Sequence, residues 1–156
     1  MRILRKVCAA VMIFCVFAFV WLLRTGGEKL GKEQVTLTGD FERTVSREEF
    51  IAGAAGYFLP GECPEEAVKA VCAVVSTRLE RGDATGFSLL SGTDAELIMK
   101  TAKEYGSLVL FDEKGPLDTK GFNAQELCRL AEEGYSCTEL LGHFYPGAVL
   151  KEKSVN

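Results

Sequence analysis

The sequence predicts a small, mostly helical α+β domain behind an N-terminal transmembrane helix. Three observations lead to this prediction: an apolar run near the N-terminus, a series of helix-capping patterns after it, and one short β-rich run. A chain of 156 residues has room for one domain and an appendage. The sequence contains no internal repeat and no low-complexity segment that would favour another organisation.

The apolar run spans residues 7–23, and Arg24 closes it. Its 17 residues reach the lower limit of the roughly 17–25 that a membrane-spanning helix needs. The run shows no polar face, it is longer than the usual apolar core of a signal peptide, and no small-x-small cleavage site follows it. We therefore favour an uncleaved anchor over a cleaved signal peptide. Arg2, Arg5 and Lys6 place the rest of the chain outside the cytoplasm, although basic residues after the run reduce this asymmetry.

Three helices are predicted in the first half of the domain. Ser46 opens the first one as Ser-x-x-Glu, which is the pattern of a capping box. The second begins near Pro64, since proline is favoured in a first turn, and Gly82 ends it. The third spans residues 94–105 and ends at Gly106. On the second helix we predict an apolar face of Ala67, Ala70, Val71, Val74 and Val75 and a polar face of Lys69, Thr77 and Glu80.

The second half begins with a strand and ends with two helices. Residues 107–111 are rich in β-forming side chains, and a turn sequence follows at 112–115. Asn123 can cap a helix that ends before Gly134. Ser136 begins a second capping box, which predicts another short helix directly after the first.

The charges are divided unevenly along the chain. After residue 24 there are 14 basic and 22 acidic side chains, a net charge of −8. Such a surface lacks the basic patch that nucleic-acid binding requires, so we exclude DNA and RNA as partners. The same charge gives this part no attraction to an anionic lipid surface.

Four cysteines lie in the predicted domain, namely Cys63, Cys72, Cys128 and Cys137. They could form two disulfides in three different pairings, and their spacing does not fit a zinc site. We favour free thiols over disulfides, and we interpret Cys72 as a buried free thiol because apolar residues surround it in the sequence.

Residues 121–150 form the most informative segment, GFNAQELCRLAEEGYSCTELLGHFYPGAVL. The segment combines the two capped helices with an exit turn at residues 144–147, where Pro146 forbids helix continuation and Gly147 permits a turn. As an ordered string it resembles the end of the sporulation stage II protein D family (SpoIID/LytB). In that family a GMSQYGA-type helix leads into MAxxGxSYxEILxxYYPG.

A second segment, residues 46–78, carries the same resemblance. It is similar to the family pattern YVxGVVAxEMPxxxPxEALKAQAVAARTY, and no gap is needed over residues 50–77. Gly53 and Pro60 match the family's glycine and first proline, and residues 66–70 match EALKA.

A third similar segment, residues 101–118, matches the end of a family helix and the strand and turn that follow it. The resemblance thus covers most of the chain after the apolar run. The predicted division is an anchor at 1–24, a tether at 25–45 with a short strand at 35–37, a SpoIID-like domain at 46–150 and a tail at 151–156.

The resemblance implies a reaction and the residue that performs it. Family members that cut peptidoglycan are lytic transglycosylases, which cleave between the two sugars and leave a 1,6-anhydro end. Such a reaction needs a carboxylic acid kept protonated by its surroundings, but not the second carboxylate of an inverting glycosidase. The family's acid position is Phe58 in this chain, and a phenyl ring cannot donate a proton. The nearest carboxylate is Glu62, although an acidic residue leading a helix is the commoner interpretation.

A second departure from the family is a deletion. In the family a long loop after the strand shapes the glycan groove, and a metal site is associated with it in some members. Here residues 116–120 run directly into Gly121, Asp118 takes the place of the family histidine, and residues 122–127 replace M-S-Q-Y-G-A. Because His143 is the only histidine, a site with several histidines cannot be built. We predict neither a metal nor a cofactor.

The candidate glycan-binding residues are Tyr57, Phe58, Phe144 and Tyr145, whose rings could stack on sugars, with core packing as the alternative. We therefore predict a membrane-anchored, catalytically degenerate SpoIID-like protein of the cell envelope with a role in sporulation. It would bind peptidoglycan glycan strands or a partner envelope enzyme. The alternative is an active, minimal lytic transglycosylase that uses Glu62 as its general acid. A third hypothesis is a structural anchor whose domain serves protein partners only.

Overall fold

The computed structural model of the chain describes residues 34–37, 43–83, 86, 88, 90 and 94–153. These residues belong to one compact unit that begins at Gln34. The predicted anchor, its apolar run at 7–23 included, lies outside the described residues, as do residues 25–33 of the predicted tether and 154–156 of the predicted tail. Within the described part of the chain, no helix has the length and apolar character needed to cross a membrane.

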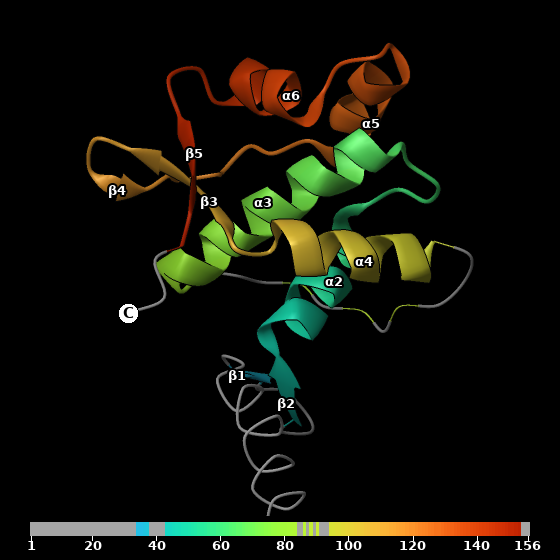
Figure 1. Ribbon diagram of the computed structural model, residues 1–156, viewed down its shortest axis with the longest axis vertical. Helices are drawn as coiled ribbons and strands as arrows, with labels where there is room; N and C mark the ends of the chain where they lie inside the picture. Colours follow the sequence, from blue (N-terminus) through green and yellow to red (C-terminus); the bar gives the residue numbers. More distant parts are fainter. Residues whose placement is uncertain are drawn as a thin grey trace, which may run out of the picture. The chain divides into compact units, whose positions relative to one another are not determined.

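The described unit is an α+β fold in which helices predominate, as the sequence predicts (Figure 1). Its strands form a two-stranded antiparallel sheet, β1-β2, and a three-stranded antiparallel sheet in the order β4-β3-β5. The elements are β1 (Gln34–Leu37), β2 (Arg43–Ser46), α2 (Arg47–Phe58), α3 (Glu65–Arg81), α4 (Ala95–Tyr105), β3 (Leu108–Asp112), β4 (Gly115–Pro116), α5 (Ala124–Glu132), α6 (Cys137–Phe144) and β5 (Val149–Glu152).

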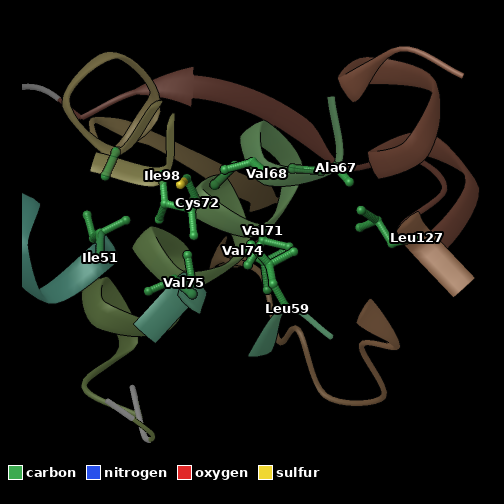
Figure 2. Packing of buried hydrophobic residues seen from close by; sticks show 14 of the residues in the cluster. Ile51, Leu59, Ala67, Val68, Val71, Cys72, Val74, Val75, Ile98 and Leu127 are labelled. Carbon is green, nitrogen blue, oxygen red and sulfur yellow. The ribbon is translucent and has the colours of Figure 1, made fainter. Parts of the chain in front are cut away.

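Helix α3 is the centre of the unit. It contacts α2, α4, β3, α5 and α6, and Figure 1 shows it crossing the middle of the fold. In Figure 2 its side chains Val68, Val71, Val74 and Val75 occupy the middle of the view, with Ile51 of α2 at the left and Leu127 of α5 at the right, and all of them belong to one buried cluster. Because neighbours cover it on several sides, α3 is buried well beyond a single apolar face.

This burial corrects the prediction that Thr77 lies on a polar face. Thr77 is fully buried, because β3 packs against this part of α3. Its hydroxyl donates a hydrogen bond to the Ala73 carbonyl at 2.7 Å and accepts one from the Leu110 backbone N–H at 2.9 Å. A short hydroxyl side chain can enter a core in this way, since the backbone satisfies both of its hydrogen-bonding functions.

The helix ends confirm the capping predictions. Ser46 and Glu49 form a capping box at the start of α2, and the Asn123 side chain accepts from two backbone N–H groups of α5. Gly82 ends α3 with φ of 73°, and Gly134 follows α5 with φ of 96°. Both glycines adopt the left-handed conformation that other residues rarely take.

The N-terminus of α6 is held by two carboxylates. Ser136 and Glu139 form the predicted capping box. In addition, Glu66 of α3 accepts a hydrogen bond from the Cys137 backbone N–H at 2.7 Å and another from Lys69 at 2.7 Å. These bonds, that from Lys69 first, hold the pKa of Glu66 below its ordinary value. Glu66 thus joins α3 to α6, in accord with the preference of helix N-termini for negative charge.

The four cysteines divide into one disulfide and two free thiols. Cys63, in the turn before α3, is bonded to Cys128 of α5, with 5.6 Å between the two Cα atoms. The prediction of free thiols is therefore wrong for this pair. Cys72 and Cys137 are free and buried, which confirms the interpretation of Cys72. Burial raises the pKa of Cys72 to about 12 and that of Cys137 to about 11.

Candidate functional site

Phe58, which the resemblance aligns with the family's acid, is the last residue of α2 and packs partly against the core. The guanidinium carbon of Arg78 lies 5.2 Å from the centroid of its ring. The Phe122 ring meets it edge to face, with centroids 6.3 Å apart and an interplanar angle of 88°. Phe58 therefore joins the ends of α2 and α3 to the segment that precedes α5.

Tyr57, its neighbour, is the most exposed large hydrophobic side chain of the described residues, with 59% of its surface accessible. Its ring lies 5.4 Å from that of Phe58 at an angle of 85°. The backbone of Gly86 approaches one side of the Tyr57 ring so closely that a Cβ atom there would lie 2.6 Å from Cδ1. The ring is thus supported from one side while much of it faces solvent, which suits stacking on a sugar.

Arg78, near the C-terminal end of α3, is fixed by Thr119. Its Nε donates to Thr119 Oγ1 at 3.0 Å, and its Nη2 donates to the Thr119 carbonyl at 2.9 Å. Thr119 is buried, in the segment between β4 and α5. Together with the Phe58 ring, these bonds hold the guanidinium in one orientation.

Tyr145, which follows α6, reaches the same Thr119 carbonyl and donates its hydroxyl proton at 3.3 Å. Burial raises the pKa of Tyr145 to about 12; Asp118 acts in the same direction and Arg78 opposes it. Phe144 lies between His143 and Tyr145, at 5.3 Å and 6.5 Å between ring centroids.

The structure thus links the two predicted aromatic pairs through two residues that sequence reasoning missed. Arg78 lies over Phe58, and Thr119 accepts from both Arg78 and Tyr145. We call Tyr57, Phe58, Arg78, Thr119 and Tyr145 the aromatic–arginine cluster. The sequence offered one signal for Arg78, a cation three residues after the apolar stretch 70–75 of α3. It offered none for Thr119, whose part depends on the path of the chain between β4 and α5.

Glu62, the candidate general acid, lies on an exposed turn between α2 and α3, next to the disulfide-bonded Cys63. A general acid of this kind is kept protonated by burial among apolar groups, whereas the Glu62 side chain faces solvent. The carboxylate also lacks a hydrogen bond or ion pair with any other described residue. Its catalytic role stays a prediction.

A second polar cluster, partly buried, lies at the N-terminal end of α2. Arg47 donates to the Ser76 hydroxyl and the Gly106 carbonyl, at 2.8 and 3.3 Å. It also pairs with Glu80 at 2.7 Å, and Lys153 pairs with the same carboxylate oxygen at 3.0 Å. Because both cations compensate Glu80, this cluster acts as a structural link between α2, α3 and the residue after β5.

Across the residues that the structure describes, histidine, cysteine, aspartate and glutamate side chains do not gather in groups of three or more that could hold a metal ion. Comparison with protein-family models, with curated proteins and with solved structures yields no match. The resemblance to the SpoIID family therefore rests on the residues quoted above.

Proposed function

We propose that this chain is a membrane-anchored, SpoIID-like protein of the cell envelope that has lost the family's catalytic acid and binds the glycan strands of peptidoglycan. A partner envelope enzyme is the other ligand that this proposal admits. The observation that carries it is the aromatic–arginine cluster, in which the position of the family's acid holds Phe58 beside the exposed ring of Tyr57.

The disulfide supports a location outside the cytoplasm. Disulfides persist in oxidising compartments and are rare in the reducing cytosol. The Cys63–Cys128 bond joins residues that are 65 positions apart in the domain. It agrees with the orientation that the basic residues before the apolar run predict.

The second candidate function is that of a minimal lytic transglycosylase. It rests on Glu62, which lies four residues after the family's acid position on an exposed turn and imitates the family's E-x-P pattern as Glu-Cys-Pro. The Glu62→Gln variant separates the two proposals, because only an enzyme would lose glycan cleavage. A third candidate, a structural anchor for protein partners, predicts no retention on peptidoglycan.

The test uses the full chain in a mild detergent, mixed with purified peptidoglycan whose stem peptides have been removed. We expect the protein to pellet with the glycan and mass spectrometry to find no new 1,6-anhydro ends. Tyr57→Ala should reduce pelleting, whereas Tyr135→Ala, which changes another exposed tyrosine with 41% accessibility, should not. Anhydro ends that vanish in Glu62→Gln would overturn the proposal in favour of the enzyme. If the protein neither pellets with the glycan nor cleaves it, the result would favour the third candidate, the structural anchor.

A further inference from the structure

We propose that Arg78 recognises a carboxylate on the bound sugar and makes the aromatic–arginine cluster selective for an acidic glycan over a neutral one. The inference rests on the proposed function, because it names the determinant of specificity within the same surface. It concerns how Arg78 binds the glycan and makes no claim about whether the protein cleaves it.

The first argument is the fixed orientation of the guanidinium. Two of its three nitrogen atoms, Nε and Nη2, donate to Thr119, and the Phe58 ring lies 5.2 Å from its central carbon. A guanidinium held in this way loses little further freedom when it binds a ligand, so its remaining N–H groups are preorganised.

The second argument is that Arg78 has no acidic partner among the described residues. Three other arginines of the helices each pair with a carboxylate, Arg47 with Glu80, Arg81 with Asp83, and Arg129 with Glu126 and Glu133. The domain is rich in acids, with 22 in the whole chain. Within the described residues, however, Arg78 Nη1 lacks both a hydrogen bond and an ion pair.

Asp118 directly precedes Thr119 in the chain, yet its carboxylate does not pair with Arg78. Its carboxylate instead lies 3.5 Å from Lys120 and 4.0 Å from Arg81. The half-buried Arg78 is thus a cation whose charge no described carboxylate neutralises. Side chains of this kind are usually paired when they leave water, so the missing partner points to a ligand.

The third argument is that the Arg78 guanidinium and the nearby Tyr57 ring together match the chemistry of an acidic sugar. The planar guanidinium donates pairs of hydrogen bonds to carboxylates, and these charge-assisted bonds are stronger than neutral ones. Tyr57, beyond the Phe58 ring, offers an exposed aromatic surface for a sugar ring. In peptidoglycan freed of stem peptides, every second sugar bears a lactyl carboxylate. A strand of this kind supplies both the ring and the negative group.

The experiment changes the ligand before the protein, so that its outcome does not depend on whether a variant folds. The full chain in mild detergent is titrated with a stem-peptide-free glycan fragment and with the same fragment after its carboxylates are converted to amides. We expect the carboxylate form to bind about tenfold more tightly at low salt, because one charge-assisted interaction is lost in the amide. Added salt should reduce this difference.

The protein variants then assign the difference to one residue. Arg78→Gln should bind both fragments with equal affinity, near that of the amide for the unchanged protein. Arg81→Gln, on the same helix, serves as the matched control and should keep the tenfold preference.

Two results would overturn the inference while leaving glycan binding intact: equal affinities for both fragments in the unchanged protein, or a preference that survives in Arg78→Gln. Binding of neither fragment would reject the proposed function and this inference with it.

Discussion

Reduction of the Cys63–Cys128 disulfide is the perturbation with the largest expected effect on the domain. The bond ties the turn before α3 to α5, and the two residues are 65 positions apart. A reductant removes this link and leaves every side chain otherwise in place. Cys72 and Cys137 are already free thiols, so the reductant does not change them.

The magnitude follows from the length of the closed loop. In the chain-entropy model, a cross-link between residues 65 apart restricts the unfolded chain by roughly 4 kcal/mol at about 25 °C. Domains of this size are stable by only about 5–15 kcal/mol. The disulfide therefore supplies a large fraction of the free energy of unfolding.

The assay is urea unfolding of residues 34–156, the compact unit, followed by far-UV circular dichroism with and without reductant. Tryptophan fluorescence is unsuitable, because the single tryptophan, Trp21, precedes this unit. With a urea dependence of about 2 kcal/mol per molar, a loss of about 4 kcal/mol lowers the midpoint by about 2 M.

The double variant Cys63→Ala/Cys128→Ala is the control. It should unfold near the midpoint of the reduced protein and should not respond to reductant. Thiol titration of the unreduced 34–156 unit in denaturant should detect two thiols, those of Cys72 and Cys137. Four reactive thiols, or a midpoint that moves by less than about 0.5 M on reduction, would refute the reasoning.

Three substitutions test individual contacts, each by unfolding of the same unit. Thr77→Val should lower the free energy of unfolding by about 1–3 kcal/mol, because the buried Leu110 N–H loses its acceptor; Thr77→Ser should cost less, and equal costs would contradict this reason. The pKa of Glu66 lies below its ordinary 4.5 in the folded state, so its contribution to stability is present above pH 4.5 and is lost as the pH falls through the folded pKa. Glu66→Gln should therefore flatten the acid side of the stability curve, and an unchanged slope would reject this role. Arg47→Met should lower the free energy of unfolding by about 1–3 kcal/mol, because the buried hydrogen bonds of Arg47 to Ser76 and Gly106 are lost while Lys153 still compensates Glu80; an unchanged free energy of unfolding would contradict this reason.

The parts of the fold that the sequence predicted are those encoded within a few neighbouring residues. The capping box at Ser46 places its donor and acceptor three residues apart, and the structure forms it as predicted. The same holds for Asn123 and Ser136. The α4 helix, predicted over 94–105, begins at Ala95. Local hydrogen bonds of this kind need no knowledge of the tertiary fold.

The features that were missed depend on partners far away in the chain. Strand β5 pairs with β3, and its residues 149–152 carry no strand signal strong enough to compete with the predicted tail. Thr77 lies on the polar side of an isolated helix, yet β3 covers it in the fold. The Cys63–Cys128 pairing is one of three possible arrangements until α5 is placed beside the turn before α3.

The candidate site shows the same limit at the level of chemistry. The sequence alone pointed to Phe58 and Tyr145 as members of two separate aromatic pairs. The residues that connect them, Arg78 and Thr119, belong to no motif, because their contacts arise from the path of the chain from β4 to α5. The short connection there brings Thr119 within hydrogen-bonding distance of both Arg78 of α3 and Tyr145.

Arg78 also bears on whether a general acid could act at the position of Phe58. A general acid must stay protonated until it donates, and a nearby cation favours the ionised carboxylate instead. The guanidinium lies 5.2 Å from the Phe58 ring, in the space that a carboxyl at this position would share. We therefore predict that Phe58→Glu alone produces no glycan cleavage, because Arg78 would favour the ionised carboxylate; new 1,6-anhydro ends from this variant would contradict the reasoning. A cation that would oppose a general acid at this position is well placed to bind an acidic ligand.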